Sequence, residues 1–209
     1  MAAAPNRVLS SPALPSNEPG TVLLETSNLI IRRWQASDAP ALAMAANYPS
    51  IAANLRDRFP MPYSLADAEE YLANGAVSPE SYPSAAAILI KPKAGHNSSD
   101  EPLLIGGSGL EPKGDVYYRT WELGYWFTPS AWGKGYATEF VGAFVPWAFG
   151  TWPRLNRIEA MAYARNEGSN KVLRKCGFTL EGRRRGAIEK NGEVLDESIW
   201  GILRSDIEQ

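Results

Sequence analysis

The stretch Trp121-Glu-Leu-Gly-Tyr-Trp-Phe-Thr-Pro-Ser-Ala-Trp-Gly-Lys-Gly-Tyr-Ala-Thr-Glu139 decides the fold, because it predicts a strand, a glycine-containing loop and the start of a helix in direct succession. Gly133 and Gly135 lack a Cβ and can adopt conformations that turn successive backbone N–H groups toward one point. The helix N-terminus beyond them adds unpaired donors and the positive end of its dipole. The side chain of Lys134 can add a full positive charge at the same place. The stretch therefore predicts an anion cradle suited to a pyrophosphate.

Two well-known nucleotide-binding loops do not fit this cradle. In the nucleotide P-loop a Ser or Thr follows the lysine and binds magnesium, whereas Gly135 follows Lys134 in this chain. In the dinucleotide fingerprint Gly-x-Gly-x-x-Gly, Thr138 stands where the third glycine belongs. On spacing alone, an ordinary strand-to-helix turn with two glycines therefore remains an alternative to a cofactor site.

Hydrophobic periodicity, helix caps and turn residues predict the elements on both sides of this stretch. The predicted strands are Leu23–Trp34, Ala85–Ile90, Leu103–Leu110, Trp121–Phe127, Ile158–Tyr163, Phe178–Glu181 and Ser198–Leu203. The predicted helices run from the cap at Ser37 and Asp38 to Asn47, from the cap at Ser64 over Leu65–Ala73, along Ala137–Ala148, and over Ser169–Cys176 with Ser169 as N-cap. Strands that alternate with helices predict a mixed α/β sheet in a single domain, residues 21–209, after a disordered tail at residues 1–20.

Two short patterns add local expectations. Gly106, Gly107 and Gly109 inside the strand Leu103–Leu110 predict a bulge or a close backbone approach. The basic run Arg183–Arg185 predicts a solvated turn, with contact to ligand phosphates or a substrate carboxylate as the alternative.

Composition excludes several classes of function. The chain has 209 residues and a formal net charge of -2, so no field of one sign favours nucleic acid or an anionic membrane as a partner. Cys176 and His96 are the only cysteine and histidine, which excludes an intramolecular disulfide and a Cys/His metal cluster. His96 lies in a predicted solvated loop, which disfavours histidine-dependent hydrolases. Because we find no signal peptide and no apolar membrane span, we expect a cytoplasmic protein.

Two ordered motifs carry a resemblance to a known family. They are Trp132-Gly-Lys-Gly-Tyr-Ala-Thr-Glu139 after Gly124-Tyr-Trp-Phe127 and, further along the chain, Asn166-Glu-Gly-Ser-Asn-Lys-Val-Leu-Arg-Lys-Cys-Gly-Phe178. Together they resemble the GCN5-related N-acetyltransferase (GNAT) superfamily, and more closely its RimJ/RimL-like branch of ribosomal-protein N-terminal acetyltransferases. The resemblance implies a strongly twisted mixed sheet flanked by helices. In this fold two central parallel strands, here those ending near Phe127 and Tyr163, splay apart and admit the pantetheine arm of acetyl-CoA.

The resemblance also implies which residues bind acetyl-CoA. The strand end before the cradle is expected to offer backbone groups to the pantetheine arm, and the cradle is expected to wrap the pyrophosphate. The implied residues are Trp126, Phe127, Thr128, Trp132, Gly133, Lys134, Gly135, Tyr136, Ala137, Thr138, Asn166 and Lys171. The family motif begins with Arg or Gln where this chain has Ser130, which removes one long polar side chain but leaves the backbone cradle.

The resemblance implies direct transfer of the acetyl group, so Cys176 is expected to belong to the core rather than to act as a nucleophile. Ser169 is the implied general acid, whose hydroxyl protonates the departing CoA thiolate. Glu122 is the first candidate for the general base that collects the proton of the amine. In the RimL-like branch a glutamate follows the Asn-x-x-Ser helix instead, and here Ile188 occupies that position with Glu189 beside it.

We therefore predict an acetyl-CoA-dependent N-acetyltransferase that uses no metal and transfers acetyl directly to a primary amine. A peptide α-amine has a pKa of about 7.7 to 8.0, so a weak base suffices, whereas a lysine side chain with a pKa of about 10.4 needs more help. The acceptor remains open between a protein or peptide N-terminus and a small amine, and the oligomeric state between monomer and homodimer. The alternative prediction is a catalytically weak acyl-CoA-binding sensor or partner module on the same fold.

Overall fold

The computed structural model describes residues 9–75, 85–92 and 101–208 and divides into two compact units. Unit 1 comprises Met1–Leu14, Leu110–Gly124 and Val141–Gln209, and unit 2 comprises Pro15–Gly109 and Tyr125–Phe140. His96 and residues 1–8 of the predicted tail lie outside the described residues, and residues 9–20 contain no helix or strand. The boundary between tail and domain stays a prediction.

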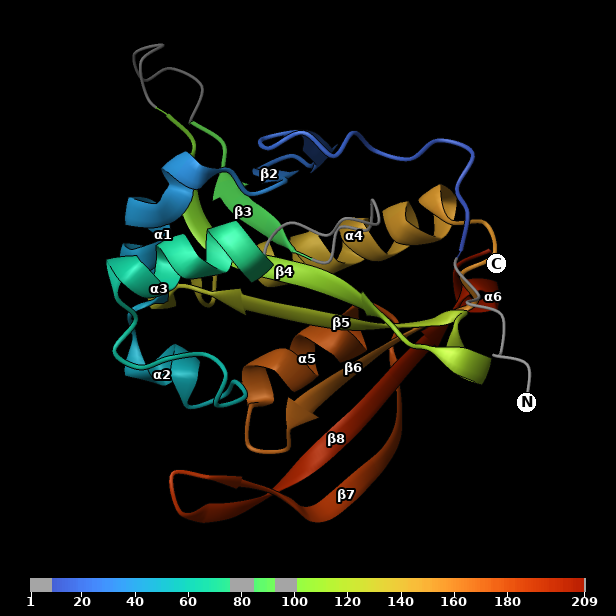
Figure 1. Cartoon of the computed structure of the whole chain (residues 1–209). Coiled ribbons are helices and arrows are strands. Elements are labelled where there is room, and N and C mark those ends of the chain that lie inside the picture. The colour runs from blue at the N-terminus through green and yellow to red at the C-terminus, as the bar shows by residue number, and fades with distance from the viewer. Residues whose placement is uncertain (1–8, 76–84, 93–100, 209) are drawn as a thin grey trace, which may run out of the picture. The chain divides into compact units, whose positions relative to one another are not determined.

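The strands form a mixed sheet in the order β1-β2-β3-β4-β5-β6-β8-β7 (Figure 1). They are β1 Val22–Glu25, β2 Leu29–Arg32, β3 Ala86–Ile90, β4 Leu103–Pro112, β5 Thr120–Phe127, β6 Arg157–Tyr163, β7 Thr179–Lys190 and β8 Glu193–Leu203. β5 pairs with β6 in parallel, whereas the pairs β1–β2, β2–β3, β3–β4, β6–β8 and β7–β8 are antiparallel. β4 and β5 contribute residues to both units. The predicted mixed α/β sheet is confirmed.

In unit 2, the prediction of one strand over Leu23–Trp34 is wrong, because the chain reverses at Thr26–Asn28. β1 and β2 form an antiparallel hairpin across this turn. The Leu29 N–H donates to the Thr26 hydroxyl at 3.0 Å, and the Thr26 N–H donates to the Leu29 carbonyl at 3.0 Å. Thr, Ser and Asn favour turns through such local bonds, and the apolar residues on both sides hid the break.

The helical elements of unit 2 begin at caps and turns that the sequence partly indicates. They are η1 Ala36–Asp38, α1 Ala39–Ala46, α2 Pro49–Ala52, α3 Leu65–Glu70, η2 Tyr71–Gly75 and η4 Pro129–Ala131. The predicted Ser64 cap is confirmed, because its hydroxyl accepts from the Asp67 N–H at 3.2 Å and the Asp67 carboxylate accepts from the Ser64 N–H at 2.7 Å. This reciprocal capping box starts α3. The sequence does not indicate α2, because four residues are too few to show a helical period.

The glycines of β4 allow a close backbone approach, as predicted. A Cβ at Gly106 would lie 2.3 Å from the Trp126 carbonyl oxygen, and one at Gly107 would lie 2.8 Å from Trp126 Nε1. Both distances are far below van der Waals contact, so a larger residue at Gly106 would displace the β5 backbone and one at Gly107 would displace the Trp126 side chain. The β3–β4 register also shifts between Ile88 and Leu89, which is a bulge. Gly106 and Gly107 therefore seat the end of β5, directly before the predicted cradle.

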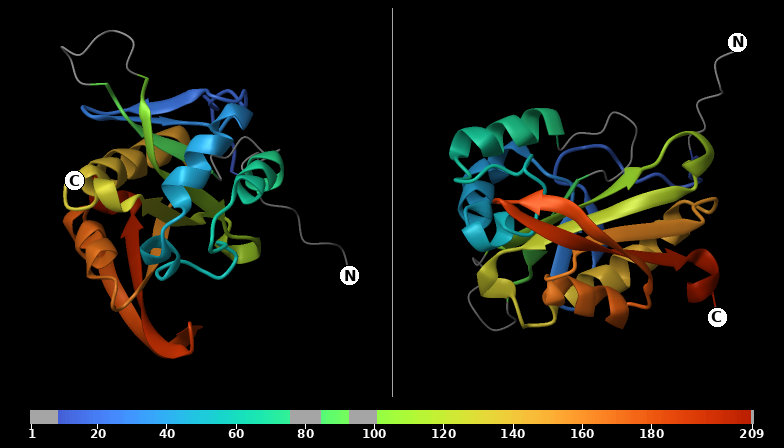
Figure 2. Two further views of the ribbon diagram at one scale, coloured as in Figure 1. Left: turned by 90° about the vertical axis from the view of Figure 1, so that its left-hand side faces the viewer. Right: turned by 90° about the horizontal axis from the view of Figure 1, so that it is seen from below.

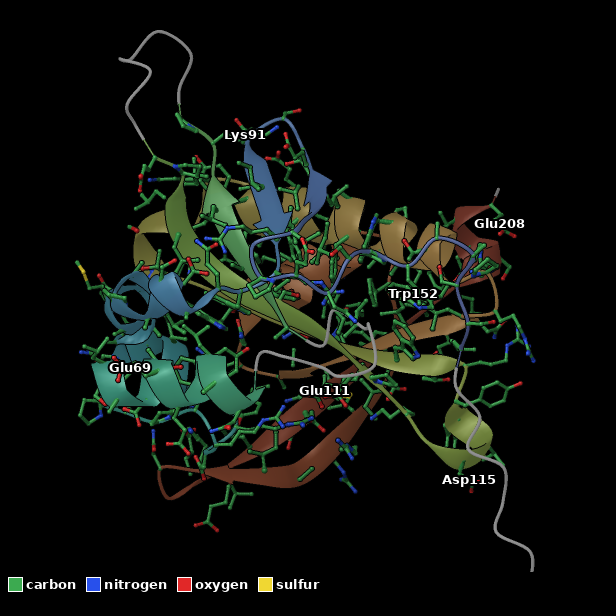
Figure 3. The ribbon with its side chains drawn as sticks, turned by 45° about the horizontal axis from the view of Figure 1, so that its top comes forward. Glu69, Lys91, Glu111, Asp115, Trp152 and Glu208 are labelled. Atoms are coloured by element: carbon green, nitrogen blue, oxygen red, sulfur yellow. The ribbon has the colours of Figure 1, made fainter. Side chains whose placement is uncertain are left out.

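Unit 1 holds the remaining helices and a pair of buried aromatic rings. The helices are η3 Asp115–Tyr117, most of α4 Tyr136–Thr151, α5 Glu167–Lys175 and α6 Arg204–Ile207. The rings of Trp121 and Trp152 are fully buried and lie 4.7 Å apart between centroids, and Figure 3 marks Trp152 just beyond α4. This aromatic pair packs one face of β5 in unit 1. In the described part of the chain, no helix combines the length and the apolar character that crossing a bilayer requires.

β7 and β8 form a hairpin that extends well beyond the two predicted strands (Figure 2). The predicted turn at Arg183–Arg185 is wrong, because these residues lie within β7. The chain reverses instead at Asn191 and Gly192, whose φ values are 53° and 77°. An Asn-Gly pair with positive φ at both residues matches the twist of a two-residue hairpin. The exposed, charged residues of β7 hid this strand, because they show no apolar alternation.

Candidate functional site

The loop between β5 and α4, in unit 2, has the backbone conformation expected of an anion cradle. Gly133 and Gly135 have φ values of 72° and 86°, in the left-handed region that favours glycine. No atom of the described residues lies within 4 Å of a Cβ placed at either glycine, so the backbone conformation and not packing requires glycine here. Trp132 and Lys134 beside them are exposed. The loop therefore fits a ligand that approaches the backbone closely.

The first turn of α4 continues this cradle. Tyr136, Ala137 and Thr138 form the first turn of α4, where the backbone N–H groups point out of the helix end. The next N–H, that of Glu139, already donates to the Gly135 carbonyl at 2.9 Å. The helix has 16 residues, so its aligned peptide dipoles place partial positive charge at this end. Donors and dipole together suit a phosphate or pyrophosphate group.

Glu139 anchors the start of α4 to the β1–β2 turn within unit 2. Its carboxylate accepts from the Thr26 hydroxyl at 2.6 Å, from the Asn28 N–H at 2.8 Å and from Asn28 Nδ2 at 2.9 Å. Burial raises the pKa of Glu139, but the hydrogen bonds from Thr26 and Asn28 and the charge of Lys91 outweigh it, so the pKa lies below its ordinary value. Lys91, marked in Figure 3, also donates to the Thr26 carbonyl at 2.7 Å. The first turn of α4 is therefore fixed to the β1–β2 turn of the sheet.

The end of β5 has backbone groups that already carry hydrogen bonds. The Thr128 N–H donates to the Ile105 carbonyl at 2.8 Å. The Phe127 carbonyl accepts from Trp132 Nε1 at 2.7 Å, which brings two of the predicted cofactor-binding residues together and closes the loop on the strand. Because a carbonyl oxygen has two lone pairs, Phe127 retains the capacity to accept one more hydrogen bond. The roles predicted for Trp126, Phe127 and Thr128 stay predictions.

In unit 1, α5 begins one turn earlier than the sequence indicates. The prediction of Ser169 as N-cap is wrong, because Asn166 is the N-cap and its side-chain oxygen accepts from the Ser169 N–H at 3.1 Å. Asn is as good an N-cap as Ser, and Glu167 and Gly168 are compatible with a first helical turn. The structure therefore brings Asn166 and Ser169 together in one cap. Ser169 lies at the third helical position, half-buried.

Asn170 is a further polar residue of this cap that the sequence analysis missed. Its Nδ2 donates to the Tyr163 carbonyl at 3.1 Å and to the Asn166 carbonyl at 2.8 Å. Its Oδ1 accepts from the indole N–H of Trp200 at 2.9 Å. Asn170 thus joins the end of β6, the start of α5 and the middle of β8. Its neighbours in space come from distant parts of the sequence, so no local pattern could have indicated this role.

Glu122, the predicted general base, belongs to an ion-pair cluster in unit 1. Its carboxylate lies 2.8 Å from Lys113 Nζ, and Lys113 also lies 3.2 Å from Glu159. Burial lowers the pKa of Lys113, but its hydrogen bonds to Glu122 and Glu159 outweigh it, so the pKa lies above its ordinary value. Glu122 and Glu159 are direct partners in the β5–β6 ladder, whereas Asn166 follows the far end of β6. Glu122 therefore sits where the two strands are still paired.

Unit 1 also contains the candidate residues Lys171, Ile188, Glu189 and Cys176. Lys171 is exposed and pairs with Glu167 at 3.0 Å, an interaction of the kind that contributes little in water. Glu189 is exposed on β7, and Ile188 beside it is half-buried. Burial raises the pKa of Cys176, which keeps the thiol protonated, as expected for a residue that packs rather than reacts. Among the described residues, no group of three or more His, Cys, Asp or Glu side chains is arranged to hold a metal ion.

Comparison with known proteins identifies the family. A family model for the acetyltransferase (GNAT) domain matches residues 28–179. The chain belongs to the GNAT acetyltransferases. The predicted superfamily is therefore confirmed, and the GNAT match includes both the cradle and the Asn166–Ser169 cap.

Curated relatives of this GNAT chain come from bacilli. It is 33% identical over 105 residues to the uncharacterized N-acetyltransferase YoaA of Bacillus subtilis, a match that covers 50% of this chain and 58% of that protein. It is 34% identical over 85 residues to the uncharacterized N-acetyltransferase p20 of Bacillus licheniformis, covering 41% of this chain and 47% of that one. The chain thus spans about half the length of these two relatives.

Solved structures share the GNAT fold at lower identity. A ribosomal-protein-S5-alanine acetyltransferase from Vibrio fischeri has a TM-score of 0.71 and 23% identity, over 88% of this chain and 97% of that chain. RimL, described as the ribosomal L7/L12 α-N-protein acetyltransferase in complex with coenzyme A, has a TM-score of 0.69 and 21% identity, over 87% of this chain and 97% of that chain. At these identities the likeness establishes the fold.

Proposed function

We propose that this chain is an acetyl-CoA-dependent N-acetyltransferase of the RimJ/RimL-like branch. The observation that carries the proposal is the cradle at Trp132–Thr138, with two left-handed glycines directly before a long helix, in a chain of the GNAT family. Backbone donors at a helix N-terminus suit the pyrophosphate of CoA better than any neutral ligand. The occurrence of a CoA complex among proteins of this fold supports the assignment.

The proposed reaction transfers acetyl directly to a neutral primary amine. The amine nitrogen attacks the thioester carbonyl carbon, the C–S bond breaks, and the thiolate leaves with the sulfur electron pair. We assign protonation of that thiolate to the Ser169 hydroxyl and removal of the amine proton to Glu122. Ser169 then regains a proton from solvent and Glu122 releases one to it. The Asn166 cap holds the first turn of α5, which carries Ser169. The Glu122 carboxylate lies 2.8 Å from Lys113 Nζ, and a carboxylate is a weak base for this step.

The weakness of this base favours an acceptor that is partly neutral at physiological pH. With a pKa of about 7.7 to 8.0, roughly 10–20% of a peptide α-amine is neutral at pH 7. A lysine ε-amine with a pKa of about 10.4 would need a stronger base. We therefore propose a protein or peptide N-terminus, or a small amine of comparable pKa, as the acceptor. Two neighbours of this fold bear names of ribosomal-protein acetyltransferases, which agrees with this choice.

The test measures release of free CoA thiol from acetyl-CoA over a panel of N-terminal peptides and small amines. We expect turnover with at least one acceptor. Ser169→Ala and Glu122→Gln should each lower kcat by about 10²-fold or more, the size of a general acid–base contribution, with less change in CoA affinity. Unchanged turnover in both variants would show that these two assignments are wrong, and failure of the wild-type chain to bind CoA would overturn the proposed function.

A catalytically weak acyl-CoA-binding module is the second candidate function. Its support is the ion pair that occupies Glu122 and the presence of Ile188 where relatives in the RimL-like branch carry a glutamate. The same assay separates the two candidates. Tight CoA binding without thiol release on any acceptor would favour the module.

A further inference from the structure

The parallel ladder between β5 and β6 is short and ends at an ionic contact. It pairs Thr120 with Arg157, Trp121 with Ile158, and Glu122 with Glu159. β5 continues to Phe127 and β6 to Tyr163, and beyond Glu159 the described residues of β6 pair with β8. Lys113, one residue after β4, contacts both carboxylates of the last pair, at 2.8 and 3.2 Å. One ammonium group therefore joins the two strands where their pairing stops.

The two carboxylates at the end of the ladder need a positive charge between them, and Lys113 supplies it. Paired residues of neighbouring strands share one face of the sheet, so Glu122 and Glu159 stand side by side. Their side chains are only 15% and 19% exposed, so solvent screens their repulsion incompletely. Without the ammonium of Lys113, the repulsion between the two facing carboxylates at the last pair would be stronger, and Arg157, 3.5 Å from Glu159, would offset part of it. With the ammonium, the same carboxylates draw the strands together.

The contact extends across the sheet of unit 1 as one connected chain of ion pairs. Arg157 lies 3.5 Å from Glu159 and binds Glu181 of β7 through both terminal nitrogens. The Arg157–Glu181 pair passes over Gly201 of β8. A Cβ at Gly201 would lie 2.5 and 2.6 Å from the Arg157 terminal nitrogens and 2.6 Å from Glu181 Oε1. Glycine at this strand position therefore leaves room for the ion pairs to cross β8.

Resting on the proposed acetyl-CoA-dependent function, we propose that Lys113 is a positioning residue that fixes where β5 and β6 stop pairing. In the proposed function the pantetheine arm contacts the end of β5, which lies at Phe127, five residues before the cradle at Trp132. Lys113 acts through Glu122 and Glu159 and touches no part of the cofactor itself. Its loss lets the ladder end move, which misaligns the strand end that receives CoA.

The test compares CoA affinity, measured by calorimetric titration, with thermal stability in the full-length chain. Lys113→Met removes the ammonium but keeps the apolar stem, and we expect it to weaken CoA binding about tenfold, which corresponds to about 1.4 kcal/mol. Lys113→Arg restores a cation that can bridge both carboxylates, so it should return the affinity to within about twofold of wild type. Lys175→Met, at an exposed lysine in the last turn of α5, is the control that removes the same charge elsewhere.

The outcomes separate this inference from the function on which it rests. If wild type binds CoA, and Lys113→Met binds it within twofold of wild type, the inference is wrong and the proposed function stands. If wild type does not bind CoA, the proposed function fails first. If Lys113→Met does not fold, Lys113→Gln, which also removes the charge but keeps a polar side chain, takes its place, and its CoA affinity decides in the same way. If Lys175→Met lowers the CoA affinity as much as Lys113→Met does, the effect comes from net charge alone and the positioning role is wrong.

Discussion

Single residues set the strictest requirements on the cradle. The left-handed backbone at Gly133 and Gly135 is predictable from the sequence, because few residues other than glycine adopt that conformation at little cost. The hydrogen bonds of Asn170 are not predictable from the sequence, because their partners come from β6, the start of α5 and β8. Ser169 lies between these cases. Its helix is predictable, but its place in the cap is decided by Asn166, which is an equally good capping residue.

Replacement of Gly135 by Ala tests the left-handed backbone directly. A Cβ at a φ of 86° costs about 1–2 kcal/mol, so Gly135→Ala should lower the free energy of unfolding, weaken CoA binding, or both. Gly142→Ala is the matched control, because Gly142 is an exposed residue within α4 with no described neighbour in the way of a Cβ. It should raise the free energy of unfolding by up to about 1 kcal/mol. Urea unfolding and CoA titration measure both effects, and a Gly135→Ala protein indistinguishable from wild type would contradict the account.

At the scale of elements, helices are predicted better than strand ends. α3 is recognisable from the Ser64–Asp67 box and α4 from its apolar periodicity. The β1–β2 and β7–β8 hairpins are missed or shortened, because apolar residues run through the first turn and exposed charges cover β7. The ladder partners Glu122 and Glu159, which both form ion pairs with Lys113, are similarly hidden, since pairing of strands so far apart in the chain leaves no local pattern.

The attachment of α4 to the β1–β2 turn predicts a specific pH dependence. The folded pKa of Glu139 is lowered, so the stabilisation it gives is present above its unfolded pKa of about 4.3 and is lost as pH falls through the lower folded pKa. Glu139→Gln should therefore lower the free energy of unfolding at pH 7 by about 1 kcal/mol, a value reduced for partial exposure to solvent. Near pH 3 the difference from wild type should shrink. Urea unfolding at both pH values measures it, and an equal difference at both would exclude the lowered pKa as its source.

For the whole molecule, the amino-acid composition argues against several classes of protein but does not identify a function. One cysteine and one histidine leave no pair for an intramolecular disulfide or a Cys/His metal cluster, and a charge of -2 predicts weak electrostatic attraction to nucleic acid. Two ordered motifs then carried the family, and the match over residues 28–179 confirms it. The acceptor is not predictable by the same route, because its specificity depends on surfaces that carry no shared motif. The two compact units also have no signature in the sequence, since β4, β5 and α4 run through both.

The central claim is that the cradle of this chain binds the pyrophosphate of CoA, and one titration tests it most directly. Binding of CoA is compared with binding of pantetheine, which has the same thiol arm but no phosphate, by wild type and by Gly135→Val. The account predicts that wild type binds CoA at least about 100-fold more tightly than pantetheine, a preference of about 2.7 kcal/mol, and that Gly135→Val loses most of that preference. Equal binding of CoA and pantetheine by wild type would contradict it.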